Sequence, residues 1–422
     1  MKTRGSVCTG SCFTGLVIAL VLLLARQPIH AQTYGEKVLY NFTGADGDGA
    51  VPEANLLLIG SNLYGTTFYG GASSYGNVFM VNKKTGEESV LYNFNGSPSD
   101  GENPNSNLIK DSNGDLYSTT SYGGASSYGT VFMVNKKTGK ESVLYNFNGS
   151  PSDGANPGTL GGLVIDSAGN FYGTTTGGGV SGCDVNGFWG CGTIFKVSPT
   201  GGETVLYSFC SESGCKDGAN PIAGLIMDDK GNLYGTTFYG GAFSAGTIFK
   251  VDPATGIEAV LYNFTGGSDG AGPVGPLIMD SAGNLYGTAL HGGLISSVCA
   301  SNDYVGCGTV FELAASGKQT VLYGFCSQTN CTDGANPNTS LIKDSKGNFY
   351  STTFYGGASG VGTVFVVNKK TLKETVIHSF TGSTSDGANP HGSLIRDASG
   401  NLFGTTMYGG TYGAGTVFQL IP

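Results

Sequence analysis

The chain has 422 residues, among them 73 Gly, 22 Tyr and 23 Phe, and only 12% of its residues are charged. This composition is too apolar for a disordered protein and too rich in glycine for a helical one, so it favours an all-β protein with many turns. Without residues 1–31 the chain has 18 basic and 30 acidic residues, a formal charge of −12, which argues against nucleic acid as a partner.

The first 31 residues predict a signal peptide. Lys2 and Arg4 supply positive charge, residues 16–25 are an apolar run, and Ala31 ends a plausible cleavage site before Gln32. The apolar run is short for a membrane span, and no later stretch is apolar enough to be one. We therefore expect a secreted or extracytoplasmic product, in the periplasm, at the cell surface or outside the cell, without a membrane span.

One pattern recurs seven times in residues 32–422. It contains a strand such as VLYNF, a DGxxP turn, a short apolar strand, a DSxGN-like turn, a strand reading NLYGTT, a glycine-rich loop and GTVF. The repeats are 52–64 residues apart, which is room for four strands and no helix. Short strands rich in Val, Tyr, Phe and Thr between Gly, Asn, Asp and Pro are typical of antiparallel hairpins.

The ends of the chain favour a ring over a solenoid, the rival repeat architecture. The chain starts with one strand (38–42) that elsewhere ends a repeat, and it finishes with the three strands (393–395, 401–406 and 416–420) that begin one. Together they make one complete blade, which closes the ring and covers its edges. The sequence therefore predicts an all-β, seven-bladed β-propeller of four-stranded antiparallel blades as a single domain, residues 32–422, which we expect to be a monomer.

At these repeats the chain resembles the Gloeo/Verruco (GloVer) tandem-repeat family of exported proteins. The residues that carry the resemblance include Asn62 to Thr67, Tyr69-Gly70-Gly71 and Val78-Phe79, and it covers essentially all of residues 32–422. The resemblance implies a location outside the cytoplasm and brings no reaction or catalytic residue with it. Many members resemble anchored proteins with a C-terminal sorting segment; this chain stops at Pro422 after its last strand, so a freely exported product is expected.

An aspartate begins each DGxxP turn, and a ring of carboxylates would suit calcium, because hard cations take oxygen ligands. The competing interpretation, which we favour, is a turn in which the carboxylate accepts backbone N–H groups. No other cofactor is expected. The weak candidates for a metal site are Asp48, Asp100, Asp153, Asp217, Asp269, Asp333 and Asp386.

A YGG tyrosine follows the NLYGTT strand in five repeats, on loops that should share one face with the DGxxP turns. Such tyrosines would stack on sugar rings and give weak sites that add up around the ring. The alternative is that each ring wedges between two blades. The candidate ligand-binding residues are Tyr69, Tyr122, Tyr239, Tyr355 and Tyr408, together with His291, which replaces the tyrosine in one of the two remaining repeats.

Those two repeats carry cysteine-bearing insertions with identical spacings of 8, 19 and 5 residues. An even number of cysteines in an exported chain favours disulfides over zinc. Three pairings are possible in each set; we favour the local loops, although Cys191 and Cys210 also bracket a hairpin. The two sets are Cys183, Cys191, Cys210 and Cys215, and Cys299, Cys307, Cys326 and Cys331.

The insertions also carry Phe188, Trp189 and Tyr304 on the expected binding face. A stapled loop with the only Trp of the chain is a candidate binding site, because ordering it on association costs little; a disulfide that merely stabilises a long insertion is the alternative.

Evidence for an enzyme is thin, and whether the chain is one stays open. No GxSxG, HExxH or P-loop motif is present. His378 replaces a strand tyrosine and is expected to be structural, which leaves His291 near Asp residues as the one seed of a catalytic site. We expect a binding or scaffolding propeller that recognises polysaccharide or a surface protein through its loop face. The alternatives are a lyase or hydrolase with a site at the axial channel, and a structural envelope component.

Overall fold

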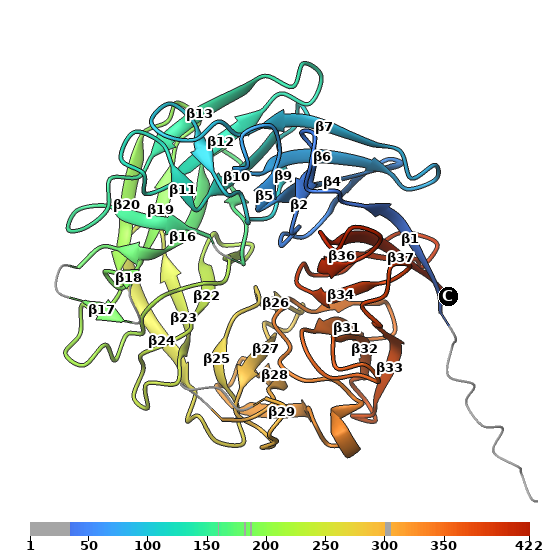
Figure 1. The fold of residues 1–422 in the computed structure, drawn as a ribbon. Coiled ribbons are helices and arrows are strands. Elements are labelled where there is room, and N and C mark those ends of the chain that lie inside the picture. The colour runs from blue at the N-terminus through green and yellow to red at the C-terminus, as the bar shows by residue number, and fades with distance from the viewer. Residues whose placement is uncertain (1–33, 159, 181–182, 186–187, 300–304) are drawn as a thin grey trace, which may run out of the picture. The chain divides into compact units, whose positions relative to one another are not determined.

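The computed structural model describes residues 34–422 except 159, 181–182, 186–187 and 300–304. The predicted signal peptide, residues 1–31, lies outside the described residues and stays a prediction. The described residues form a ring of seven antiparallel sheets around a central axis (Figure 1). The expectation of an all-β, seven-bladed propeller is therefore confirmed.

Each blade has four strands, numbered here from the axis outward. The inner strands are β3 (Leu57–Ile59), β9 (Ile109–Lys110), β15 (Val164–Ile165), β21 (Ile226–Met227), β26 (Ile278–Met279), β30 (Ile342–Lys343) and β35 (Ile395–Arg396). The second strands are β4 (Asn62–Thr67), β10 (Leu116–Thr120), β16 (Phe171–Gly178), β22 (Leu233–Thr237), β27 (Leu285–His291), β31 (Asn348–Thr353) and β36 (Leu402–Gly409).

The two outer layers continue this order around the ring. The third strands are β6 (Asn77–Asn82), β12 (Thr130–Val134), β19 (Thr193–Val197), β23 (Thr247–Asp252), β28 (Thr309–Leu313), β32 (Thr363–Asn368) and β37 (Thr416–Ile421). The outermost strands are β7 (Glu88–Asn93), β13 (Glu141–Asn146), β20 (Glu203–Ser208), β24 (Ile257–Asn263), β29 (Gln319–Gly324), β33 (Glu374–Ser379) and β1 (Gly35–Asn41).

Short strands in the connections tie each DGxxP turn to the YGG loop of the blade that follows it. The pairs are β2 (Gly49–Ala50) with β5 (Tyr69–Gly70), β8 (Gly101–Glu102) with β11 (Tyr122–Gly123), and β14 (Gly154–Pro157), β25 (Ala271–Pro273) and β34 (Gly387–Pro390) with the ends of β16, β27 and β36. The connections also contain the hairpin β17 (Asp184–Val185) and β18 (Phe188–Trp189) and the 3-10 turn η1 (Thr329–Cys331). The two kinds of connection thus share one side of the ring, called the loop face below.

The ring closes through the two ends of the chain, as expected. Strand β1 pairs antiparallel with β37, with Gly35 opposite Ile421 and Asn41 opposite Thr416. The first strand of the chain therefore completes blade 7 as its outermost member, and this pairing covers the edge that β37 would otherwise expose.

Seven pairs of phenylalanines hold neighbouring blades together. The last residue of each VLYNF-like strand packs against the GTVF phenylalanine of the next blade, with ring centroids 4.9–5.2 Å apart. All fourteen rings are completely buried. The second strand passes so close to this contact that a Cβ at Gly65 would lie 2.5 Å from Cζ of Phe79. Five blades have a glycine at this position, whereas Ser118 and Ser351 occupy it in blades 2 and 6.

In the described residues, no helix is long and apolar enough to cross a membrane.

Replacing one of these rings tests the seam. Phe249→Ala removes a fully buried ring and is expected to lower the free energy of unfolding by about 3–5 kcal/mol, measured by denaturant titration. Phe243→Ala is the matched control, because that ring is 60% exposed and its loss should change stability by less than about 0.5 kcal/mol. Equal effects of the two substitutions would show that the seam does not carry the stability.

Candidate functional site

The YGG tyrosines lie on the loop face with much of each ring in solvent. Tyr69, Tyr122, Tyr355 and Tyr408 are 52, 45, 45 and 46% exposed, whereas Tyr239 is half-buried. Three of the five rings pack edge-on against the preceding phenylalanine, as Phe354 does with Tyr355 at a centroid distance of 4.7 Å. Exposed and yet supported rings are what ligand stacking requires; binding itself stays a prediction.

The same loops carry a second set of exposed aromatics that the sequence analysis did not single out. Tyr75, Tyr128, Phe243 and Tyr412 are 37, 41, 60 and 63% exposed. They lie six residues after the YGG tyrosine in blades 1 and 2 and four residues after it in blades 4 and 7. The loop face of four blades therefore presents two aromatic rings instead of one.

The disulfides follow the local pattern that we favoured. Cys183 pairs with Cys191, Cys210 with Cys215, Cys299 with Cys307 and Cys326 with Cys331. The sulfurs of each set lie close together, since the four of the first set are within 4.8 Å of one another. The two disulfides of a set thus lie side by side, one within the insertion and one next to the neighbouring DGxxP turn.

The aromatic residues of the insertions are described only in part. Phe188 and Trp189 form strand β18, where Trp189 is opposite Asp184 and Phe188 opposite Val185. Their side chains, and Tyr304 as a whole, lie outside the described residues. The hypothesis that these residues bind a ligand therefore stays a prediction.

The seven turn aspartates bind their own turns. In Asp100, one carboxylate oxygen accepts hydrogen bonds from the Tyr92 hydroxyl at 2.7 Å and the Asn95 backbone N–H at 2.8 Å, and the other accepts from Gly101 N–H at 2.7 Å. His378 takes the place of the tyrosine in one blade, with Nε2 3.3 Å from Asp386, which agrees with its expected structural role. Within the described residues, only cysteines form groups of potential metal ligands within 4.8 Å, so calcium binding stays a prediction.

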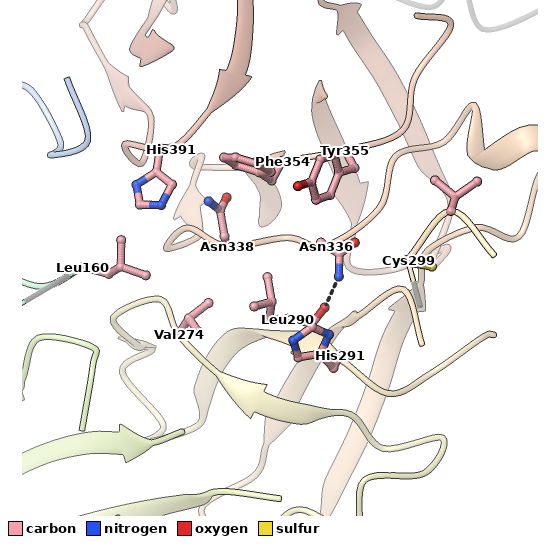
Figure 2. Close-up of a pocket in the computed structure, with 11 residues that line it drawn as sticks. Leu160, Val274, Leu290, His291, Cys299, Asn336, Asn338, Phe354, Tyr355 and His391 are labelled. Atoms are coloured by element: carbon pink, nitrogen blue, oxygen red, sulfur yellow. Dashed lines mark hydrogen bonds between the residues drawn. The ribbon is translucent and has the colours of Figure 1, made fainter. Parts of the chain in front are cut away.

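A cavity of about 430 Å³ opens between blades 5, 6 and 7, where the loop face meets the axis. Figure 2 shows His391, Asn338, Phe354 and Tyr355 along one side of it, and Leu160, Val274, Leu290 and His291 along the other. Val298 and Cys299 of the stapled insertion form a further wall. The cavity thus brings together two of the predicted site residues, His291 and Tyr355, which are 64 positions apart in sequence.

Two asparagines line the cavity with buried side-chain oxygens. Asn336 donates from Nδ2 to the Leu290 carbonyl at 2.9 Å, which leaves its Oδ1 as the available acceptor (Figure 2). Neither this oxygen nor Oδ1 of Asn338 has a hydrogen-bond partner in the structure, although the two residues are only 6 and 5% exposed. A buried acceptor without a partner costs about 1–3 kcal/mol, which a donor on a ligand would offset.

His391 of blade 7, which lines the cavity, contacts the backbone of Glu53 in blade 1. Nδ1 of His391 is 3.4 Å from the backbone carbonyl of Glu53. Burial lowers the pKa of His391 to about 4, so its ring is neutral at physiological pH. Burial also raises the pKa of Glu53 to about 7.

The sequence analysis missed Asn338, His391 and Glu53, although a signal for them existed. Each directly follows the proline of a DGxxP turn, a position that the turn brings to the axis. Whereas the proline is the same in all seven repeats, the residue after it differs, being Glu53, Asn105, Gly158, Ile222, Val274, Asn338 and His391. The residue after the proline therefore differs between repeats whose turns are otherwise alike, and this variation is the signal that could have identified it as a candidate ligand-binding position.

The chain matches the family model described as the Gloeobacter/Verrucomicrobia repeat three times, at residues 29–185, 153–300 and 291–422. No curated protein matches it in sequence. Among solved structures, it is similar to an oligogalacturonate lyase from Vibrio parahaemolyticus, with 10% identity, a TM-score of 0.53 and coverage of 92% of this chain and 97% of that one. It is equally similar to a polysaccharide lyase named as an ulvan lyase, with 10% identity, a TM-score of 0.53 and coverage of 90 and 94%. At such low identity the likeness shows the fold alone.

A row of buried carboxyl groups beside the turn aspartates gives the ring a measurable pH dependence. The outermost strand of six blades carries a glutamate whose pKa is raised to between about 7 and 8, by burial first and by a nearby turn aspartate second. In blade 5 the corresponding residue is Gln319, whose Nε2 donates to the Asp269 carbonyl at 3.2 Å. Gln319 is thus a neutral donor at the position where the other six blades have a glutamate that burial keeps protonated.

We expect the melting temperature to fall as pH rises from 5 to 9. Between the unfolded pKa near 4.5 and the folded value of about 7–8, the folded chain binds more protons, so the stabilisation present below pH 4.5 is lost as pH rises. Glu141→Gln, which mimics the protonated acid, should raise the melting temperature at pH 9 and leave it unchanged at pH 4.5. The exposed Glu87→Gln is the control, and a wild-type melting temperature that is flat from pH 5 to 9 would contradict the assignment.

Proposed function

The chain belongs to the Gloeobacter/Verrucomicrobia repeat family, and we propose that this member is an exported binding propeller that holds a polysaccharide against its loop face. The single observation that carries the proposal is the set of exposed tyrosines, because Tyr69, Tyr122, Tyr355 and Tyr408 repeat on one face of four blades. A polymer of rings is the ligand that makes use of repeated flat aromatic surfaces.

Export is supported by two features taken together. The first 31 residues have the charge and apolar run of a signal peptide. The structure pairs all eight cysteines that follow them, and disulfides persist in oxidising compartments. Polysaccharides of the envelope and of the surroundings are available to a protein in such a place.

The cavity adds a site for one part of the polymer to the stacking surface of the loop face. Weak stacking along the rim is multiplied when one polymer contacts several blades, while the 430 Å³ cavity has the size for one or two sugar rings. Its two unpartnered asparagine oxygens accept hydrogen bonds from hydroxyl groups, which every sugar offers.

A hydrolase or lyase activity in the same cavity is the second candidate. The observation that favours it is the neighbouring pair of His391, neutral at physiological pH, and Glu53, whose raised pKa of about 7 suits proton transfer. The structural likeness to two polysaccharide lyases supplies the fold for such a site and no residue of it.

Binding is tested by retention of the purified, oxidised protein on a panel of insoluble polysaccharides and by calorimetry with soluble fragments. We expect at least one polysaccharide to bind, a single Tyr→Ala change at position 69, 122, 355 or 408 to weaken it about 2–10-fold, and the fourfold variant to abolish retention.

The control variant is Ile257→Ala with Leu372→Ala, two exposed apolar residues of the hairpins on the opposite face. Retention that this control lowers as much as the tyrosine variant would point to nonspecific adhesion. Release of shortened or unsaturated sugars by wild type, lost in Glu53→Gln, would move the assignment to the enzyme. A wild-type protein retained by no member of the panel would overturn the binding proposal.

A further inference from the structure

The charge of the propeller is concentrated on one side. The described connections that build the loop face contain twelve Asp or Glu residues and one basic residue, Lys216, whereas the rest of the described residues contain seventeen of each sign. The whole formal charge of the described residues, −11, therefore belongs to the loop face. A surface of one sign attracts ligands of the opposite sign and repels those of its own.

Charge alone defines no site. The unpartnered atoms of the cavity are a second observation that favours a ligand with hydrogen-bond donors. Oδ1 of Asn336 and Oδ1 of Asn338 are buried acceptors without donors, and both belong to residues that line the cavity. The orientation of Asn336 is fixed, because its Nδ2 is already bound to the Leu290 carbonyl. Such acceptors can bind an ammonium or hydroxyl group, which donates hydrogen bonds. They cannot bind a carboxylate or sulfate, which only accepts them.

The next blade places Glu53 at the equivalent position of the repeat. Glu53 holds the position in blade 1 that Val274, Asn338 and His391 hold in blades 5, 6 and 7, and it is in contact with His391. Among the described residues its carboxyl takes part in no ion pair. Burial raises the pKa of Glu53 to about 7, and a cation bound beside it would favour the ionised carboxylate as its counter-charge.

The described lining of the cavity holds no lysine and no arginine. His391 is neutral at physiological pH. An acidic sugar would thus enter an acidic face and meet no cation to bind its charge, so acidic polysaccharides are disfavoured. Exposed tyrosine faces, in contrast, attract cations through their π electrons.

We propose that the polysaccharide held by the loop face carries protonated amino groups, and that the cavity between blades 5 and 7, with Glu53 beside it, binds one amino sugar. The inference rests on the proposed function and goes further by naming the chemical class of the ligand. The aromatic rim contacts the rings of the chain, while the buried asparagine oxygens and the Glu53 carboxylate accept hydrogen bonds from the ammonium group.

The experiment compares three soluble probes by calorimetry at pH 6.5 and at 20 and 300 mM salt: a hexamer of glucosamine, a hexamer of N-acetylglucosamine, and an oligogalacturonate. The first two differ in charge at the same ring. We expect the glucosamine hexamer to bind at least tenfold more tightly than the acetylated one at low salt, to weaken as salt rises, and the oligogalacturonate not to bind.

Two variants test whether the amino group binds at the cavity. Glu53→Gln should lower the affinity for the glucosamine hexamer at least fivefold and leave the acetylated hexamer unchanged. Asn338→Leu, which removes the acceptor and keeps the volume, should weaken both probes. Glu87→Gln is the matched control, since it removes one carboxylate from an exposed hairpin on the opposite face. Melting temperatures equal to that of wild type show that each variant is folded.

The possible outcomes separate the two proposals. If both hexamers bind equally, or if the oligogalacturonate binds best, the amine inference is overturned while polysaccharide binding stands. If Glu87→Gln reduces the affinity as much as Glu53→Gln, the attraction is a property of net charge and the cavity is not the site. If no probe and no member of the polysaccharide panel binds to wild type, both proposals fail.

Discussion

The contact between the last phenylalanine of one blade and the GTVF phenylalanine of the next is the constraint on which the ring depends. It occurs at all seven seams with nearly the same centroid distance, and it fixes how far one sheet stands from the next. The glycine of NLYGTT, the turn aspartate and the turn proline all serve this spacing. Because the seam meets the structural demands, the residues at the loop tips are free to differ.

This division explains why the loop face is uneven although the blades are alike. Four of the residues after the turn prolines are polar, namely Glu53, Asn105, Asn338 and His391, while Ile222 and Val274 present hydrocarbon. The stapled insertions occur in blades 3 and 5 and replace a tyrosine there. A symmetric scaffold thus carries an asymmetric surface, and the cavity lies where one insertion, one tyrosine and three axial positions meet.

The sequence predicted the fold almost completely, because repetition makes a pattern visible seven times. The number of blades and the closure by β1 were within reach of spacing arguments, whereas the spacing of the cysteines left three pairings open in each set, of which the structure has the local one. The site was harder, since its residues each occur once and come from five blades. Repetition identified Tyr355, and a departure from it identified His291, but Asn338, His391 and Glu53 become neighbours only when the ring closes. The repeat pattern also does not predict how exposed each tyrosine is, because Tyr239 is half-buried whereas its four counterparts are exposed.

The pairing of β1 with β37 determines when in folding the ring can close. Blade 7 is made from the first and the last strand of the described chain, so the residues of its final ladder are separated by nearly the whole polypeptide. Contacts of such long range form slowly, and six sheets can gather before the seventh is complete. Until the C-terminal strand has been synthesised, the chain remains an open arc with unpaired edges. The sheet edges disappear only when the last residues of the chain pair with the first.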